Sequence, residues 1–164
     1  MALPNKVLPG FSAALYCQPG ATPTVLTTAQ LSLVASTAAI AVSGNLLPVE
    51  AIPAFGQDDA VASFSVAGSR QSDKIPVQAA PTSMTITAAW NPSDTNLLLM
   101  RADAYSGVID RTYVISATDG TNIVYYAFNG RVGQFQIDAQ PGAEAKCTFT
   151  IHPRGNQYGW SNNA

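Results

Sequence analysis

The clearest pattern in the chain is an alternation of apolar and polar positions in its second half. Successive side chains of a strand point to opposite faces of a sheet, so this spacing predicts half-buried antiparallel strands. Two runs show it, one in the middle of the chain and one near its end: Met84, Ile86, Ala88 and Trp90, then Cys147, Phe149 and Ile151.

A helix is predicted between these strands, over residues 92–106. Pro92 holds Asn91 in extended geometry, which suits an N-cap, and Pro92 itself fits the first helical position. Gly107 is expected to end the helix in a left-handed conformation. Apolar residues at helical spacing predict the buried stripe: Leu98, Ala102 and Tyr105, broadened by Leu97 and Met100.

A hairpin is predicted after the helix. Residues 113–117 and 123–128 are rich in β-formers and flank Asp119-Gly120. This dipeptide favours a tight turn because both residues accept positive φ. Asn129-Gly130 then indicates a bulge or corner before a further strand over residues 134–138.

The first half of the chain has a weaker pattern. Residues 11–17 alternate and predict a first strand, and β-branching in residues 24–28 favours another. Periodicity leaves residues 29–41 open between a pair of strands and a weak helix. Residues 45–55 are predicted to be a strand or bent edge, because two prolines exclude the segment from the centre of a sheet.

A long loop is predicted over residues 56–81, although residues 60–67 alternate like a strand. The loop carries the one local concentration of charge, from Arg70, Asp73 and Lys74. Loops of this length inside a compact domain are usually functional or disordered.

The tail, residues 155–164, is polar and glycine-rich and is expected to be flexible. With 164 residues and no internal repeat, the chain is predicted to be a single domain over residues 1–164.

Charge is scarce along the chain. Charged residues make up 11% of it and apolar residues 47%. This composition favours a subunit whose surface is covered by copies of itself. The alternative is a soluble domain whose surface is dominated by small and hydroxyl-bearing residues. The net charge of −2 and the lack of a basic tract argue against tight nucleic-acid binding.

The sequence contains no apolar run long enough to span a membrane. Its first residues lack the pattern of a signal peptide, so we expect a protein made in a cytoplasm. Cys17 and Cys147 lie among apolar neighbours in predicted strands. Buried free thiols are therefore expected, rather than a disulfide.

Candidate catalytic chemistry is sparse. His152 stands alone at a strand end without a second ligand at metal-binding spacing. Asp58-Asp59 could bind a divalent ion or transfer protons, but no calcium-loop spacing or partner base accompanies it. A solvated turn or an inter-subunit contact fits the doublet better. No phosphate-binding, dinucleotide-binding or nucleophile-elbow motif occurs, so no catalytic residue, cofactor or metal is predicted.

Three isolated arginines, Arg101, Arg111 and Arg131, are conspicuous among so few charges. Arginine pairs carboxylates in a bidentate manner, which suits contacts with a neighbouring subunit. Ordinary surface solubility is the equally open alternative.

The ordered set of elements is similar to the major tail tube proteins of long, non-contractile-tailed (siphovirus-like) bacteriophages. No single motif carries the resemblance, which is clear over the second half and holds only in outline over the first. The matching segments are Ala89-Trp90-Asn91-Pro92 before the helix, Arg111-Thr112-Tyr113-Val114-Ile115, the Asp119-Gly120 turn, Tyr125-Tyr126-Ala127-Phe128, Val132-Gly133-Gln134-Phe135 and the ending Pro153-Arg154-Gly155.

This resemblance implies a mainly β fold, related to the type VI secretion tube protein: an antiparallel β-sandwich or partly closed barrel flanked by one α-helix. It implies a structural virion protein that is not an enzyme. Hexameric rings of such a protein stack into the hollow tail tube that delivers the genome.

The implied partners are other copies of the chain and the tape measure, distal tail or baseplate and tail terminator proteins. DNA would pass through the lumen without specific binding. The candidate inter-ring or inter-subunit contacts are Asp58, Asp59, Arg70, Asp73, Lys74, Arg101, Arg111 and Arg131.

A different class of function stays open beside this one. A β-sandwich adhesin or carbohydrate-binding module would use exposed aromatic side chains as a platform for its ligand. The aromatic residues available for it are Tyr125, Tyr126, Tyr158 and Trp160.

Overall fold

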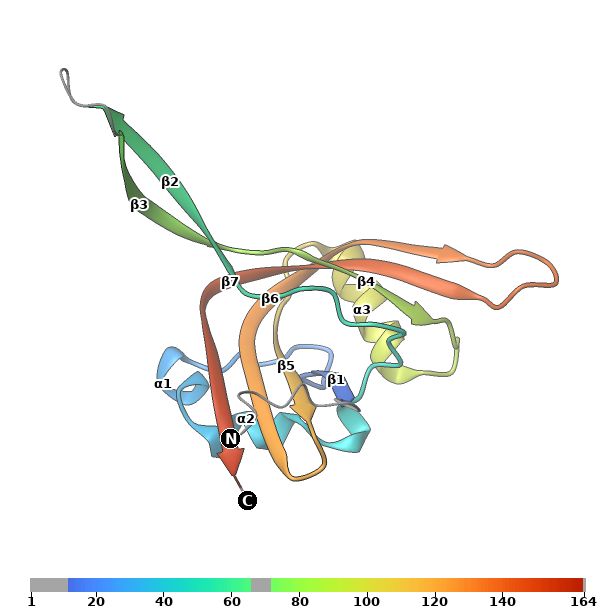
Figure 1. The fold of residues 1–164 in the computed structure, drawn as a ribbon. Helices are drawn as coiled ribbons and strands as arrows, with labels where there is room; N and C mark the ends of the chain where they lie inside the picture. The colour runs from blue at the N-terminus through green and yellow to red at the C-terminus, as the bar shows by residue number, and fades with distance from the viewer. Residues whose placement is uncertain (1–11, 66–71, 164) are drawn as a thin grey trace, which may run out of the picture.

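The computed structural model describes residues 12–65 and 72–163 of the chain. Its centre is a curled five-stranded antiparallel sheet with the order β1-β5-β6-β7-β4 (Figure 1). This confirms the predicted mainly β fold. The strands are β1 (Ser12–Cys17), β4 (Met84–Ala89), β5 (Asp110–Thr118), β6 (Asn122–Asp138) and β7 (Lys146–Asn163).

The core lies between the concave side of this sheet and helix α3 (Thr95–Ser106). The apolar positions predicted from alternation in β4 and β7 are buried, and Trp90 packs at the margin of the cluster. Tyr113 and Phe128 stack at 5.7 Å and Phe135 and Phe149 at 5.8 Å between ring centroids. The main buried residues are Leu15, Cys17, Leu47, Met84, Ile86, Ala88, Leu97, Met100, Tyr113, Ile115, Phe128, Cys147, Phe149 and Ile151.

Helix α3 begins three residues later than predicted, and its N-cap is Asp94, not Asn91. The Asp94 carboxylate accepts hydrogen bonds from the backbone N–H groups of Asn96 and Leu97, at 2.9 and 3.1 Å. Pro92 lies in the preceding turn, which the Asp94 N–H closes on the Asn91 carbonyl. The predicted end is confirmed, because Gly107 caps the helix at φ 65°.

The face of α3 that packs inward also differs from the prediction. Leu97 and Met100, which were predicted to broaden the stripe, are buried together with Asp103, whereas Leu98 and Tyr105 of the same stripe are exposed. The helix is apolar on several sides, so hydrophobicity alone did not select a face. The buried partner of Asp103, described below, draws that side of the helix inward.

Two short helices occupy the segment that periodicity left open. They are α1 (Thr28–Leu31) and α2 (Val34–Ile40), followed by the 3-10 turn η1 (Ser43–Asn45). A capping box between Thr27 and Gln30 begins α1, so the strand predicted over residues 24–28 is wrong. These helices cover a second cluster, with Leu31 and Ile40 against Val114. The expectation of one flanking helix is therefore incomplete.

Residues 46–50 close part of the sheet. The Leu47 N–H donates to the Leu15 carbonyl of β1, and the Glu50 N–H donates to the Thr87 carbonyl of β4. This segment thus spans the two edge strands and makes the partly closed barrel that was expected. The Asn96 side chain ties it to α3 by donating to the carbonyls of Gly44 and Leu46, at 3.0 Å each.

The hairpin between β5 and β6 is confirmed, with a different turn from the one expected. Its loop has three residues, of which Gly120 has positive φ (92°) and Asp119 does not. The Asp119 carboxylate instead accepts the backbone N–H groups of Thr121 and Asn122. These bonds hold the pKa of Asp119 below its usual range.

Strands β6 and β7 are longer than predicted and form a bent hairpin that crosses the whole molecule (Figure 1). Their register shifts between Phe128 and Asn129, which confirms the expected bulge, and again between Gly133 and Gln136. Gln134 there adopts φ 54°. The flexible tail predicted over residues 155–164 is wrong as far as residue 163, because these residues continue β7.

The predicted long loop over residues 56–81 is also wrong. It contains β2 (Gln57–Ser65), which confirms the strand-like alternation over residues 60–67 as far as Ser65, and β3 (Ser72–Pro81). Among the described residues these two strands pair only with each other. Figure 1 shows this two-stranded arm projecting away from the sheet. A hydrogen bond from the Thr82 N–H to the Gly56 carbonyl, 3.1 Å, closes its base. The two prolines of β3, Pro76 and Pro81, are compatible with a strand because both strands of the arm are edges.

Candidate assembly surfaces

The sheet has two free edges at one end. Residues 12–14 of β1 pair with β5 on one side, and residues 153–163 of β7 pair with β6 on one side. Within the described residues no strand pairs with their other sides. Unpaired strand edges present a row of backbone donors and acceptors to another chain.

The register places these two free edges level with each other across the sheet. Ser12 lies opposite Thr118, which lies opposite Ile123, which lies opposite Asn162. This end of the molecule is therefore a four-stranded antiparallel sheet, with β1 at one margin and β7 at the other. Strands β1 and β7 at its two margins run in opposite directions. The β7 margin of one copy and the β1 margin of another therefore have the directions that antiparallel pairing requires.

The arm is the third surface with unpaired backbone. A two-stranded hairpin is marginally stable by itself in water, and Val61 on β2 is 53% exposed. The arm carries four predicted contact residues. Asp58 and Asp59 lie opposite Ala80 and Ala79, so the acidic doublet is part of a strand and not a solvated turn. Asp73 and Lys74 lie opposite Phe64 and Ser63, and Arg70 lies outside the described residues.

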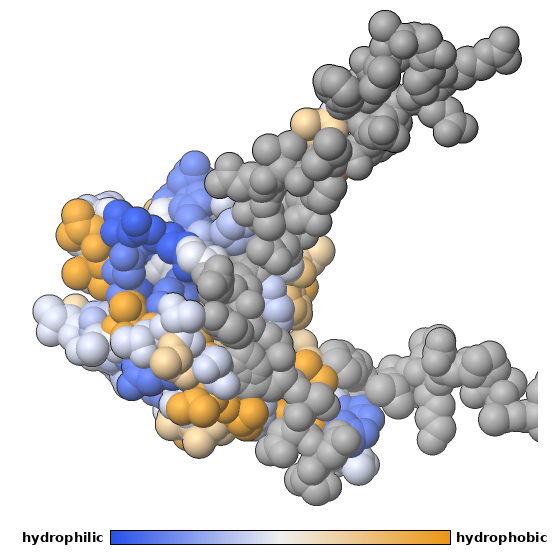
Figure 2. Space-filling view, turned by 90° about the vertical axis from the view of Figure 1, so that its left-hand side faces the viewer, coloured by the Kyte–Doolittle hydropathy of each residue, from blue (hydrophilic) through white to orange (hydrophobic). Residues whose placement is uncertain are grey.

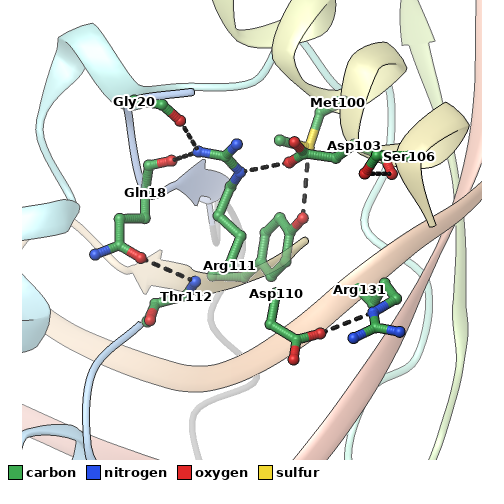
Figure 3. Close-up of polar contacts among 10 residues, drawn as sticks. Gln18, Gly20, Met100, Asp103, Ser106, Asp110, Arg111, Thr112 and Arg131 are labelled. Carbon is green, nitrogen blue, oxygen red and sulfur yellow. Dashed lines mark hydrogen bonds and ion pairs between the residues drawn. The ribbon is translucent and has the colours of Figure 1, made fainter. Parts of the chain in front are cut away.

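Arg111 is not on the surface, so the prediction that it contacts a neighbour is wrong. Its side chain is fully buried, and its Nε donates to Asp103 Oδ2 at 2.7 Å (Figure 3). Its Nη1 donates to the carbonyls of Gln18 and Gly20. Nη2 has no partner among the described protein atoms. Arg111 thus joins β5, α3 and the segment after β1 inside one subunit.

Buried titratable groups beside this pair stay neutral. Burial raises the pKa of the Cys17 thiol to about 12, and burial also raises the pKa of Tyr113 well above its usual value. The Tyr113 hydroxyl contacts Met100 Sδ at 3.5 Å. Cys17 and Cys147 are both free and buried, which confirms the expectation for the two thiols.

Arg131 is one-third exposed and its charge is already paired. Its Nε donates to Asp110 Oδ1 at 2.9 Å, and its guanidinium also donates to the carbonyls of Gly107 and Val108. Arg154 donates to the other Asp110 oxygen at 2.9 Å. Partial burial acts to raise the pKa of Asp110, but the two arginines outweigh it and hold this pKa below its usual value. An additional contact of Arg131 with a neighbour stays a prediction.

Arg101 lies on the outward face of α3. Its guanidinium carbon stands 5.6 Å from the centre of the Tyr105 ring. Of the Lys and Arg side chains that the structure describes, it is the one without an ion pair to a carboxylate. Leu98, Arg101, Ala102 and Tyr105 line a shallow pocket of about 290 Å³.

The outward face of α3 was missed by sequence reasoning. Leu97 and Met100, predicted only as the margin of the buried stripe, recur at helical spacing with Ala104, and Asp103 interrupts that row with a charge. A buried partner such as Arg111 was needed to make Asp103 an inward residue. A local pattern cannot supply that partner, which comes from another element.

Exposed hydrophobic side chains also occur around α1 and α2, where Leu33, Val34, Val42 and Leu46 are at least one-third exposed. Figure 2 views the molecule from the left-hand side of Figure 1 and shows orange hydrophobic areas interrupted by hydrophilic ones. In its lower part they gather at the level of these helices.

The aromatic platform suggested for a binding module is not formed as proposed. Tyr126 packs on Phe55, with 4.8 Å between the ring centroids, and against the main core. Tyr125 packs against the second cluster. Neighbouring residues of a strand face opposite sides, so these two rings cannot share one surface. The side chains of Tyr158 and Trp160 lie outside those described.

Among the described residues, no three His, Cys, Asp or Glu side chains gather as metal ligands do. His152 Nδ1 instead lies 2.9 Å from Ser83 Oγ. No helix within the described part of the chain has the length and apolar character that crossing a bilayer needs.

Two solved structures resemble the chain over most of its length. A chain in the six-fold-symmetrised baseplate of the anti-feeding prophage matches with a TM-score of 0.60 at 10% identity, covering 98% of this chain and 97% of that one. A chain of the SPP1 tail tube matches with a TM-score of 0.54 at 10% identity, covering 93% and 77%. No protein-family model and no curated protein matches the sequence. The chain therefore has the fold of tail tube and baseplate proteins.

Proposed function

We propose that this chain is the structural subunit of a phage-like tail tube, in which copies join head to tail into rings and the rings stack into a hollow conduit. The observation that carries the proposal is the whole-length likeness to a chain of a six-fold-symmetrised baseplate, with 98% and 97% of the two chains covered. The second similar structure comes from the SPP1 tail tube, so a tube is also among the assemblies formed by proteins with this fold.

The free sheet edges support a head-to-tail ring. The outer margin of β7 in one subunit can pair with the outer margin of β1 in the next, because both lie at the same level and run in opposite directions. Repetition of this contact around a closed ring leaves no free edge at that level of the sheet. The six-fold symmetry of the similar baseplate suggests six subunits in each ring.

The arm supports stacking of the rings. It projects beyond the sheet (Figure 1), and its two strands need a covering surface to be stable. Within this proposal Asp58, Asp59, Asp73 and Lys74 bring their charges to the contact between rings, and Arg70 belongs to the same arm. The surface that covers the arm is another ring of the tube.

The conduit would carry DNA without binding it specifically. Tight binding to phosphates needs clustered basic side chains, and four of the five described Lys and Arg side chains are held by carboxylates of the same subunit. The partners in this account are other copies of the chain, the tape measure protein, the distal tail or baseplate proteins and the tail terminator. The proposed location is the tail of a long, non-contractile-tailed virion, after assembly in the host cytoplasm.

Sedimentation velocity and negative-stain electron microscopy of the purified protein test the proposal. Rings or tubes at increasing protein concentration, or after addition of a tail initiator, are expected. A species that stays monomeric under both conditions would contradict the proposal. The β-sandwich binding module is the competing class, and a specific hit on a glycan array would favour it.

A further inference from the structure

The outward face of α3 is an apolar surface with a cation at its centre. We infer that it is a docking site for the β6–β7 hairpin tip, residues 137–145, of a second copy of the chain. This inference rests on the proposed self-assembly, and it adds a contact that the pairing of sheet edges does not require.

The first argument is the exposure of this face. Tyr105 is 75% exposed and Leu98 40%, and Val108 just beyond the helix is 69% exposed. Leu98, Ala102 and Tyr105 line the shallow pocket already described together with Arg101. Large apolar side chains grouped around a shallow pocket on a soluble surface mark an interaction site more often than scattered ones do.

The second argument is the charge balance of the described side chains. Arg101 is the described cation that no carboxylate of its own subunit pairs. A matching excess of negative charge lies at the hairpin tip. Asp138 and Glu144 are exposed there without an ion pair, and the nearby Lys146 is taken by Glu50 at 2.7 Å.

The third argument is the shape of the hairpin tip. Strand β5 covers β6 only as far as Arg131. On the other side, β4 pairs with β7 from Lys146 to Ile151, and the Trp90 N–H after β4 donates to the Ala145 carbonyl, so residues 139–144 of the tip extend past both neighbours. Figure 1 shows it projecting from the sheet. Ile137 is 40% exposed beside Asp138 and offers an apolar contact next to the charges.

These features make the two surfaces complementary. The tip would place Ile137 against Leu98 and Tyr105, and the carboxylate of Glu144, from the loop of the tip, would reach Arg101. Because the two patches differ, the contact is head to tail and can repeat around a ring. Charge complementarity of this kind fixes the register and suppresses wrong partners.

Charge reversal with rescue tests the contact. The Arg101→Glu variant places like charges together, so the protein concentration needed for assembly should rise at least about tenfold. Reversal of the tip by Glu144→Lys should have a similar effect alone, and should restore assembly when combined with Arg101→Glu. The matched control Arg101→Lys keeps the charge and should assemble near the wild-type concentration. The substituted side chains, Arg101 and Glu144, are exposed, and circular dichroism checks that each variant is folded.

Cross-linking gives a second readout that does not require long tubes. One chain carries Tyr105→Cys and another carries Ile137→Cys, and the native cysteines are buried and unreactive. Mild oxidation of the mixture should link the two variants to each other, and neither variant should link to itself.

Two results would overturn the docking site without contradicting the proposed tube subunit. One is assembly of Arg101→Glu at the same protein concentration as the wild type, and the other is a cross-link of Tyr105→Cys to itself. Wild-type protein that never assembles would overturn both.

Discussion

Arg111 and Asp103 form a fully buried ion pair, 2.7 Å between Nε and Oδ2, that fixes helix α3 onto strand β5. The same guanidinium donates hydrogen bonds to the backbone carbonyls of Gln18 and Gly20, which follow β1. This one residue therefore sets the position of α3, and with it the side of the helix that faces out.

Removal of one partner of this pair should destabilise the subunit strongly. Arg111→Met leaves the Asp103 carboxylate buried without a counter-charge, which costs about 3–5 kcal/mol in the free energy of unfolding. Urea denaturation monitored by circular dichroism measures the loss. The double variant with Asp103→Leu removes both charges and should recover most of it. Equal stability of Arg111→Met and the wild type would show that the pair does not hold the helix.

The sequence revealed α3 but not its orientation, and the reason lies in this pair. Helical spacing and Gly107 act locally, so the existence and the end of the helix were predictable. The inward turn of Asp103 depends on Arg111, which reaches it from the next strand. Arg101 and Arg111 looked equivalent in the sequence. Arg101 is exposed because it lies on the side of α3 that faces away from Asp103, whereas Arg111 on β5 is buried against Asp103.

The arm was missed for a different reason. Among the described residues its strands pair only with each other, and a strand-like alternation was visible in β2 alone, over residues 60–67. Two prolines within β3 and charges in both strands favoured a loop. The strand pattern in β4 and the first part of β7 was clear because one face of each is buried in the core.

The stability of the subunit should depend on the ionisation of Asp110. The pKa of this carboxyl is lower in the folded protein, so its contribution is complete above the ordinary aspartate pKa of about 3.9 and is lost as the pH falls through the lower folded value. In Asp110→Asn, urea midpoints should therefore fall less steeply than in the wild type as the pH drops below about 4. Asp138→Asn, which removes an exposed carboxylate without an ion pair, is the control and should retain the wild-type slope.

Deletion of the arm should separate folding from tube growth. The bond between the Thr82 N–H and the Gly56 carbonyl shows that the ends of the arm are adjacent, so residues 57–81 can be replaced by a short glycine linker. The core lies outside the arm, and thermal unfolding should stay cooperative with a similar midpoint. Electron microscopy should show no tubes. Long tubes of the deletion variant would mean that the arm is not the stacking element.

Blocking the outer edge of β1 should stop ring closure. Leu15 accepts from Leu47 on the outer side, whereas Gln18 donates inward to Thr112, so odd-numbered residues of β1 point their backbone groups outward. Ala13→Pro removes one outward N–H and is compatible with an edge strand. The variant should fold and sediment as a monomer. Ala14→Pro, which removes an inward N–H, should lower stability instead, and assembly of Ala13→Pro at the wild-type concentration would exclude this edge from the contact.

Cryo-electron microscopy of the assembled wild-type protein tests the central claim most directly, through end-on class averages and a map that traces the strands. The account predicts a closed ring in which β1 of each subunit lies antiparallel to β7 of the next, around an open lumen. A closed ring joined through other elements, or particles with no lumen, would contradict it.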